Sequence, residues 1–210
     1  GYKVVRHYLC RFVWLLLISL NASASAKPVV IGYVPSFRDM IGTIDVTDLS
    51  LLTHINISFA NPDVNGVLIK NNNLQCMPNA LGNPTPVSDI QYLVTKSHQA
   101  GVKVLLSIAG GVIPVCSGNW QTLLKPASRQ LLVDNLISLI DELNIDGVDV
   151  DIEGEVLTAI DKEGNYTPFV KALSEKLIAR GKLLTCATAS YQGGMIPIFR
   201  SNIVRRMARS

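Results

Sequence analysis

From residue 27 onward, two kinds of apolar pattern alternate along the chain. Short runs rich in β-branched residues are followed by longer stretches whose apolar residues recur every three or four positions. The short runs are typical of buried strands, and the longer stretches are typical of amphipathic helices. This alternation predicts βα units and a parallel sheet. The predicted strands cover residues 29–34, 54–60, 102–108, 147–152 and 183–189.

Helices are predicted between these strands from their capping residues and apolar spacing. Ser88 is the expected N-cap of one helix, and Thr167 is the expected N-cap of another, with Pro168 at its first helical position. Glycines are expected to end both helices. The predicted helices cover approximately residues 45–51, 88–100, 132–143 and 167–180.

The two ends of the chain do not fit this pattern. Residues 1–26 hold a basic start, an apolar stretch at 12–20 and the small-residue sequence Ala24-Ser25-Ala26, which is typical of a secretory signal peptide. The apolar stretch is shorter than the roughly 20 residues that cross a bilayer as a helix. Residues 198–210 are basic, lack a stable period and lie where a sixth strand is due. We therefore expect an exported protein, secreted or periplasmic, with one domain at 27–197 and a tail that is not native to the fold.

The charge balance bears on whether the protein binds nucleic acid, and the cysteines bear on whether it forms a disulfide after export. Three of the 19 basic residues lie in residues 1–26, so the remainder carries 16 basic and 16 acidic residues. A nucleic-acid partner is not expected from this balance. Export permits a disulfide, and Cys76 with Cys116 is the preferred pair because both lie in predicted loops that follow strands. Three unpaired thiols, with Cys186 as the third, remain the alternative.

Carboxylic acids recur at every second position of the fourth predicted strand. In Asp146-Gly147-Val148-Asp149-Val150-Asp151-Ile152-Glu153, the last three acids share one face of the strand, and neighbours on that face lie roughly 7 Å apart. Burying several carboxyls together costs free energy through desolvation and like-charge repulsion unless they share protons or find partners. Paired carboxyls in distinct environments are what the cleavage of a glycosidic bond needs. The pattern therefore predicts a catalytic acid at Glu153, with Asp151 and Asp149 deeper in the same site.

Two other interpretations of these acids remain open. A calcium-binding loop also uses acids at alternate positions. Counted from Asp149, however, its twelfth position is Ile160 instead of glutamate, and a strand precedes it instead of a helix. A purely structural acid cluster would bring basic partners nearby, and residues 146–156 contain no Lys or Arg. Neither metal nor cofactor is expected.

The sequence DGVDVDIEG at residues 146–154 resembles the catalytic signature of family 18 glycoside hydrolases, the chitinases and endo-N-acetylglucosaminidases. The resemblance extends over residues 27–197. It includes Val30-Ile31-Gly32-Tyr33, the stretch from Thr53 to Ala60, and the stretch from Lys103 to Gly111. The third motif differs from the family pattern of serine, one residue and two glycines, because Ala109 intervenes before Gly110 and Gly111.

The resemblance implies a TIM-type (β/α)8 barrel whose fourth strand directs Asp149, Asp151 and Glu153 into a sugar cleft. It implies that Glu153 is general acid and then base, and that Asp151 orients the substrate's own 2-acetamido group in a retaining reaction. Asp149 would support Asp151. Supporting roles fall to Tyr33, Ser107 and Asp146, and contacts with the sugar to Phe59, Gly110 and Gly111.

The expected activity is hydrolysis of β-1,4 linkages between N-acetylglucosamine residues in chitin oligomers or related glycans. The expected partner is such an oligo- or polysaccharide, and the expected state is a monomer without membrane contact once the signal is removed. Since only five of the eight βα units of a barrel are predicted, a partial barrel with little or no activity of its own is expected. The alternative is a non-catalytic, lectin-like protein that binds chitooligosaccharides.

Overall fold

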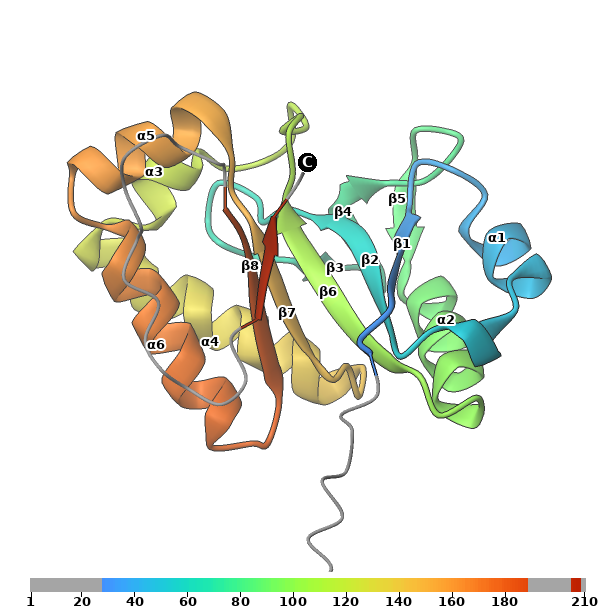
Figure 1. Cartoon of the computed structure of the whole chain (residues 1–210). Coiled ribbons are helices and arrows are strands. Elements are labelled where there is room, and N and C mark those ends of the chain that lie inside the picture. Colours follow the sequence, from blue (N-terminus) through green and yellow to red (C-terminus); the bar gives the residue numbers. More distant parts are fainter. Residues whose placement is uncertain (1–27, 189–204, 209–210) are drawn as a thin grey trace, which may run out of the picture.

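The computed structural model describes residues 28–188 and 205–208, and its centre is a curved sheet of parallel strands (Figure 1). The strand order is β1-β2-β6-β7-β8-β9, and every neighbouring pair runs parallel. The strands are β1 (Ile31–Pro35), β2 (His54–Ala60), β6 (Lys103–Ala109), β7 (Gly147–Asp151), β8 (Leu183–Thr188) and β9 (Arg205–Ala208). Five of them match the predicted strands to within two residues.

The sixth strand, β9, corrects one expectation. Residues 198–210 were expected to lack a strand, but Arg205–Ala208 pairs with Thr185 to Thr188 of β8. The stretch is short and basic, so its sequence carries no apolar alternation to reveal a strand. The rest of the 198–210 tail and the predicted signal peptide lie outside the described residues.

Helices lie in the connections between successive strands of this sheet from β1 to β8 and cover the sheet from its outer side. In Figure 1, α1 and α2 flank the β1 side of the sheet, and α4 and α6 flank the β8 side. No helix within residues 28–188 is long and apolar enough to cross a membrane. The helices are α1 (Met40–Val46), the 3-10 helix η1 (Leu49–Leu51), α2 (Val87–Gln99), α3 (Trp120–Leu123), α4 (Pro126–Glu142), α5 (Gly154–Lys162) and α6 (Tyr166–Ile178).

Several helix starts differ from the predictions. Helix α1 begins before residue 45 because the Asp39 side chain accepts a hydrogen bond from the Gly42 N–H and caps it. Pro86 occupies the N-cap position of α2, which places Ser88 inside the helix, and Asn165 precedes α6. Ser88 and Thr167 thus each lie two residues after the true N-cap.

The two faces of the sheet differ in chemistry. The outer face packs apolar side chains against the helices, including Ile55 and Ile57 of β2, Leu106 of β6 and Val148 and Val150 of β7, all buried. The inner face holds buried polar residues at matching heights. Ser58 of β2 lies beside Ser107 of β6, which lies beside Asp149 of β7 and then Thr185 of β8. The fold therefore gathers its buried polar side chains on the concave side.

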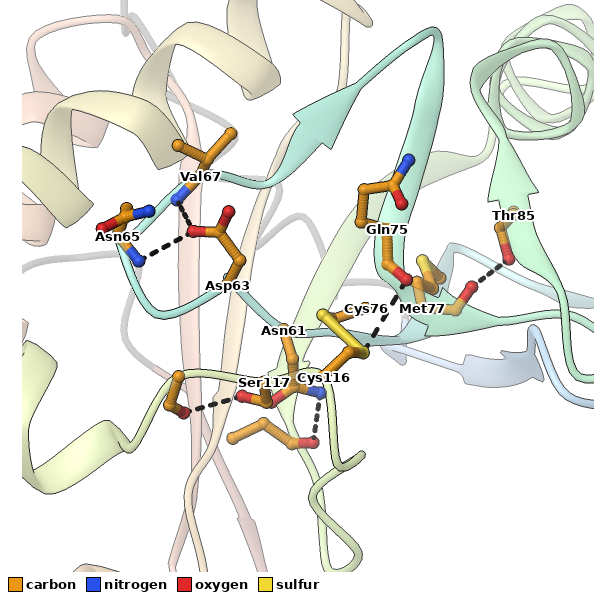
Figure 2. Close-up of a disulfide and its surroundings, with 12 residues drawn as sticks. Asn61, Asp63, Asn65, Val67, Gln75, Cys76, Met77, Thr85, Cys116 and Ser117 are labelled. Atoms are coloured by element: carbon orange, nitrogen blue, oxygen red, sulfur yellow. Dashed lines mark hydrogen bonds between the residues drawn. A yellow bond between two sulfur atoms is a disulfide. The ribbon is translucent and has the colours of Figure 1, made fainter.

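Residues 61–86 form an unpredicted excursion between β2 and α2. It contains a second, three-stranded antiparallel sheet made of β3 (Ile69–Lys70), β4 (Asn73–Pro78) and β5 (Pro84–Pro86). Cys76 of β4 forms a disulfide with Cys116 of the loop that follows β6, and the two α-carbons lie 5.7 Å apart (Figure 2). The preferred cysteine pairing is therefore confirmed, and Cys186 is a free, buried thiol.

Candidate active site

Strand β7 carries two of the three predicted acids into the concave side of the sheet. Asp149 is 1% exposed and Asp151 is fully buried. Val148 and Val150 alternate with them and lie in the core between sheet and helices. The period of two that places these side chains on opposite faces is the ordinary geometry of a strand, so the sequence pattern and the structure agree here.

Asp149 is held by hydroxyl groups from both neighbouring strands. Ser107 Oγ of β6 donates to Asp149 Oδ2 over 2.7 Å, and Thr185 Oγ1 of β8 donates to Oδ1 over 2.6 Å. Both donors lie directly opposite Asp149 in the strand register. Both carboxyl oxygens thus accept a hydrogen bond from a fixed strand position, which orients the carboxyl plane.

Glu153 follows two residues after the end of β7, at the N-cap position of α5. Its backbone is extended, with φ −130° and ψ 168°, and its side chain is half-buried. Ile152, between Asp151 and Glu153, packs in the apolar core. Alternation therefore continues past the strand, and Glu153 lies at the carboxyl end of the sheet, more exposed than the two aspartates.

The loop after β6 lies beside Glu153. A Cβ placed on Gly111 would lie 3.8 Å from Glu153 Oε2, and the N–H of Gly110 donates to the Asp151 carbonyl over 2.9 Å. A Cβ on Gly110 would lie 2.7 Å from the ring of Phe59, and Gly110 has φ +88°. Only glycine suits that position, since a side chain would both clash with the ring and strain the backbone. Phe59, Gly110 and Gly111 are thus brought together with the acids.

Tyr33 lies two strands away from Ser107, and Asp146 lies at the opposite end of β7 from Glu153. Tyr33 of β1 is 36% exposed and lies opposite Asn56 of β2 in the strand register, two strands away from Ser107. Asp146 precedes β7 at the other end of the strand. There its Oδ2 accepts from the Val104 N–H over 2.7 Å and lies 2.6 Å from His98 Nε2. Asp146 therefore joins β7 to β6 and α2 at the start of the strand.

Thr185 is a site residue that the sequence pattern did not reveal. It is 7% exposed and supplies one of the two hydroxyl donors to Asp149. A hydroxyl in the middle of a mostly apolar predicted strand was the available signal, because a buried hydroxyl needs a partner.

A buried thiol and a buried phenol lie behind the site, on the helix side of β8. Burial raises the pKa of the Cys186 thiol to about 12. Burial also raises the pKa of the Tyr166 hydroxyl well above its usual range, and the nearby thiol and the charges of Asp149 and Asp151 raise it further. Both groups therefore stay protonated and neutral at any ordinary pH. Within the described part of the chain, no cluster of three or more His, Cys, Asp or Glu side chains is arranged to hold a metal ion.

Comparison with solved structures finds the same architecture in chitinases. The GH18 chitinase ChiB from the chitin utilization locus of Flavobacterium johnsoniae superimposes with a TM-score of 0.65 and 29% identity, over 87% of this chain and 54% of that chain. A chitinase from Bacteroides thetaiotaomicron gives a TM-score of 0.53 and 26% identity, over 78% and 47% of the two chains. The curved sheet with its outer helices is therefore part of a TIM-type barrel.

Comparison of sequences agrees with the structural similarity. Chitinase B of Serratia marcescens is 27% identical over 173 residues, which cover 72% of this chain and 32% of the relative. This chain thus spans about a third of that relative's length and about half of the two solved chains. The family model for glycosyl hydrolases family 18 matches residues 29–201, a range that includes all three acids and both hydroxyl donors to Asp149. The chain belongs to glycosyl hydrolase family 18.

Proposed function

We propose that this chain takes part in the hydrolysis of β-1,4 linkages between N-acetylglucosamine residues, in chitin oligomers or related glycans. The observation that carries the proposal is the arrangement of the three acids. Asp149 is fixed between two hydroxyl donors, Asp151 is buried beyond it, and Glu153 lies half-buried at the carboxyl end of the same strand. The relatives named as chitinases support the choice of substrate.

In the proposed reaction, Glu153 donates a proton to the glycosidic oxygen as the bond from that oxygen to the anomeric carbon breaks. The carbonyl oxygen of the substrate's own 2-acetamido group attacks the anomeric carbon and forms an oxazolinium ion. Glu153, now a carboxylate, takes a proton from a water molecule that opens this ion. Two inversions at the anomeric carbon give overall retention.

The remaining side chains serve this sequence in distinct ways. Asp151 orients the acetamido group and stabilises the positive charge of the oxazolinium. Asp149, with its carboxyl held by Ser107 and Thr185, keeps Asp151 in place from below. Tyr33, two strands away from Ser107, is given a supporting role by the family resemblance, and Phe59, Gly110 and Gly111 form the wall beside Glu153.

The test replaces the proposed acid and compares it with a neighbouring acid. Glu153→Gln keeps the side-chain volume but cannot donate the proton, so we expect the low release of reducing ends from chitooligosaccharides by this partial barrel to fall to the uncatalysed background. Glu155→Gln is the matched control, because Glu155 lies exposed in the first turn of α5. Calorimetric titration with the same oligosaccharides should show that both variants still bind.

Two outcomes would contradict the proposal. Hydrolysis that is equal in the chain and in Glu153→Gln would remove Glu153 from the reaction. Binding of oligosaccharides by the unaltered chain with no release of reducing ends would instead support the lectin-like alternative.

We also infer that the chain works outside the reducing cytoplasm, as a monomer and without a membrane partner. The Cys76–Cys116 disulfide supports this inference, since such bonds form and persist in oxidising compartments. Residues 1–26, which resemble a secretory signal peptide, also support export from the cytoplasm.

A further inference from the structure

The first residues of the loop after β6 are held in an unusual backbone conformation. Ala109 has φ +73° and Gly110 has φ +88°, so two consecutive residues adopt the left-handed region. An alanine there is strained and persists only where the surroundings determine it. The turn redirects the chain so that Gly111 lies beside Glu153.

A single buried amide side chain fixes this turn. Asn61, which is 2% exposed, donates from Nδ2 to the carbonyl of Ala109 over 3.1 Å, a bond drawn in Figure 2. Its Oδ1 accepts from Trp120 Nε1 over 2.8 Å. Trp120 begins α3 and is itself buried. The indole N–H can only donate, so it determines which end of the Asn61 amide faces Ala109.

The far end of the same loop is anchored to the same segment of chain. The N–H of Gly118 donates to the carbonyl of Pro62 over 2.9 Å, and Cys116 is joined to Cys76 of β4. At the near end, Gly110 donates to the carbonyl of Asp151. The loop is therefore fastened at both ends, and Asn61 is the side chain that holds the end next to the acids.

We propose that Asn61 is a positioning residue for Glu153. It acts through the Ala109 carbonyl and the Gly110–Gly111 backbone, and Trp120 fixes the orientation of its amide. The proposal rests on the function proposed above but concerns residues outside the carboxyl signature. Asn61 touches none of the reacting atoms, so its loss should impair the chemical step more than substrate binding.

Two variants of the full chain test the proposal. Asn61→Asp keeps the size and the acceptor for Trp120 but turns an oxygen toward the Ala109 carbonyl, and Trp120→Phe keeps an aromatic ring while removing the N–H. We expect hydrogen exchange at the Gly110 amide, followed by ¹H–¹⁵N NMR, to become about tenfold faster in Asn61→Asp. We expect kcat for chitooligosaccharides to fall by roughly ten- to a hundredfold with KM within about threefold. Trp120→Phe should change both quantities in the same direction by a smaller factor.

Thr85→Val is the matched control for a general loss of stability. Thr85 is fully buried and donates to the Met77 carbonyl within the excursion (Figure 2), so its substitution also removes one buried side-chain to main-chain bond. We expect Thr85→Val to lower the Tm comparably and to leave Gly110 exchange and kcat near the values of the unaltered chain.

The outcomes separate this proposal from the proposed function. If Asn61→Asp and Trp120→Phe leave Gly110 exchange unchanged, or if Thr85→Val loses as much kcat as they do, Asn61 has no positioning role. If the unaltered chain hydrolyses no oligosaccharide, the proposed function fails, and Asn61 then cannot position an acid for that reaction, whatever the exchange rates show about the loop.

Discussion

Asp149 illustrates how a buried carboxyl is held in this fold. Its two oxygens accept from Ser107 on one side and Thr185 on the other, and each donor comes from a neighbouring strand at the same height. A buried carboxyl without such donors would carry a large desolvation cost. The two hydroxyl groups offset part of that cost and keep the carboxyl in one orientation.

We predict that Ser107→Ala and Thr185→Val each destabilise the fold by about 1–3 kcal/mol, because each leaves a buried carboxyl oxygen without its hydroxyl donor. The double variant should lose less than the sum of the two single losses, since the two donors share one carboxyl. Urea unfolding of the four proteins measures these free energies. Full additivity would mean that the two hydroxyl groups act independently of each other, and would contradict the prediction.

At the scale of residues, the sequence was informative where spacing alone carries the geometry. Alternation of acids along an apolar run was enough to place Asp149 and Asp151 on one face. Thr185 and Asn61 depend on which strands and loops become neighbours, and their bonds span 36 and 48 residues along the chain. A single hydroxyl or amide carries no periodic signal that would reveal such a partner.

Strand β7 can carry its acids only because it begins with glycine. A Cβ on Gly147 would lie 2.2 Å from the carbonyl oxygen of Leu183, the residue opposite it on β8. The contact is with the main chain of a neighbouring strand, which cannot move aside as a flexible side chain would.

We predict that Gly147→Ala destabilises the chain by about 3 kcal/mol through this overlap. Gly101→Ala is the control. Gly101 also precedes a strand, but nothing lies within 4 Å of the position of its Cβ, so only its positive φ of +73° opposes the substitution. Its cost should be about 1–2 kcal/mol. Thermal unfolding of both variants measures the difference, and equal losses would show that the approach of β8 does not matter.

The disulfide joins two elements that are distant in sequence. Cys76 and Cys116 are separated by 40 residues, and closing a loop of that length in the unfolded chain is worth about 3–4 kcal/mol in the chain-entropy model. We predict that the paired variant Cys76→Ser/Cys116→Ser loses roughly this much stability in urea unfolding. Reductant should lower the Tm of the unaltered chain and leave that of the paired variant unchanged. A Tm indifferent to reductant in both proteins would contradict the prediction.

At the scale of elements, regular strands were predictable and the excursion was not. The strand predicted at 54–60 has the bounds of β2, because its apolar residues alternate with polar ones and the run is closed by Asn61 and Pro62. Strands β3 to β5 are two to six residues long and contain prolines and asparagines, which obscure any strand period. Their pairing with one another, and not their composition, makes them strands.

In the molecule as a whole, buried polar side chains lie on one side of the parallel sheet and buried apolar side chains lie on the other. The concave side holds the acids and their donors, and the outer side holds the apolar core under the helices. Cys186 and Tyr166 lie on the outer side, where burial raises the pKa of both. Both groups ionise at a lower pH in the unfolded chain than in the folded chain. A rise in pH through the alkaline range therefore lowers the free energy of unfolding.

We predict that the free energy of unfolding falls as pH rises from about 9 to about 12. Over this range the unfolded chain loses the Cys186 proton, whereas the folded chain keeps it because its pKa is raised to about 12. The thiol alone then contributes a slope of about −1.4 kcal/mol per pH unit. Cys186→Ala should show a shallower decline than the unaltered chain, since the other ionisable groups are common to both. Parallel curves in urea unfolding would contradict the prediction.

The acids and the wall beside them come from different stretches of polypeptide. Asp149 is fixed by β6 and β8, whereas the loop beside Glu153 is fastened to the excursion at residues 61–86 by Asn61, Pro62 and the Cys76–Cys116 bond. Substitutions in the excursion outside Asn61 can therefore reshape the walls that meet the sugar without disturbing the hydroxyl groups that hold Asp149. In protein engineering, this excursion is the natural segment to exchange between homologues when a different glycan preference is sought.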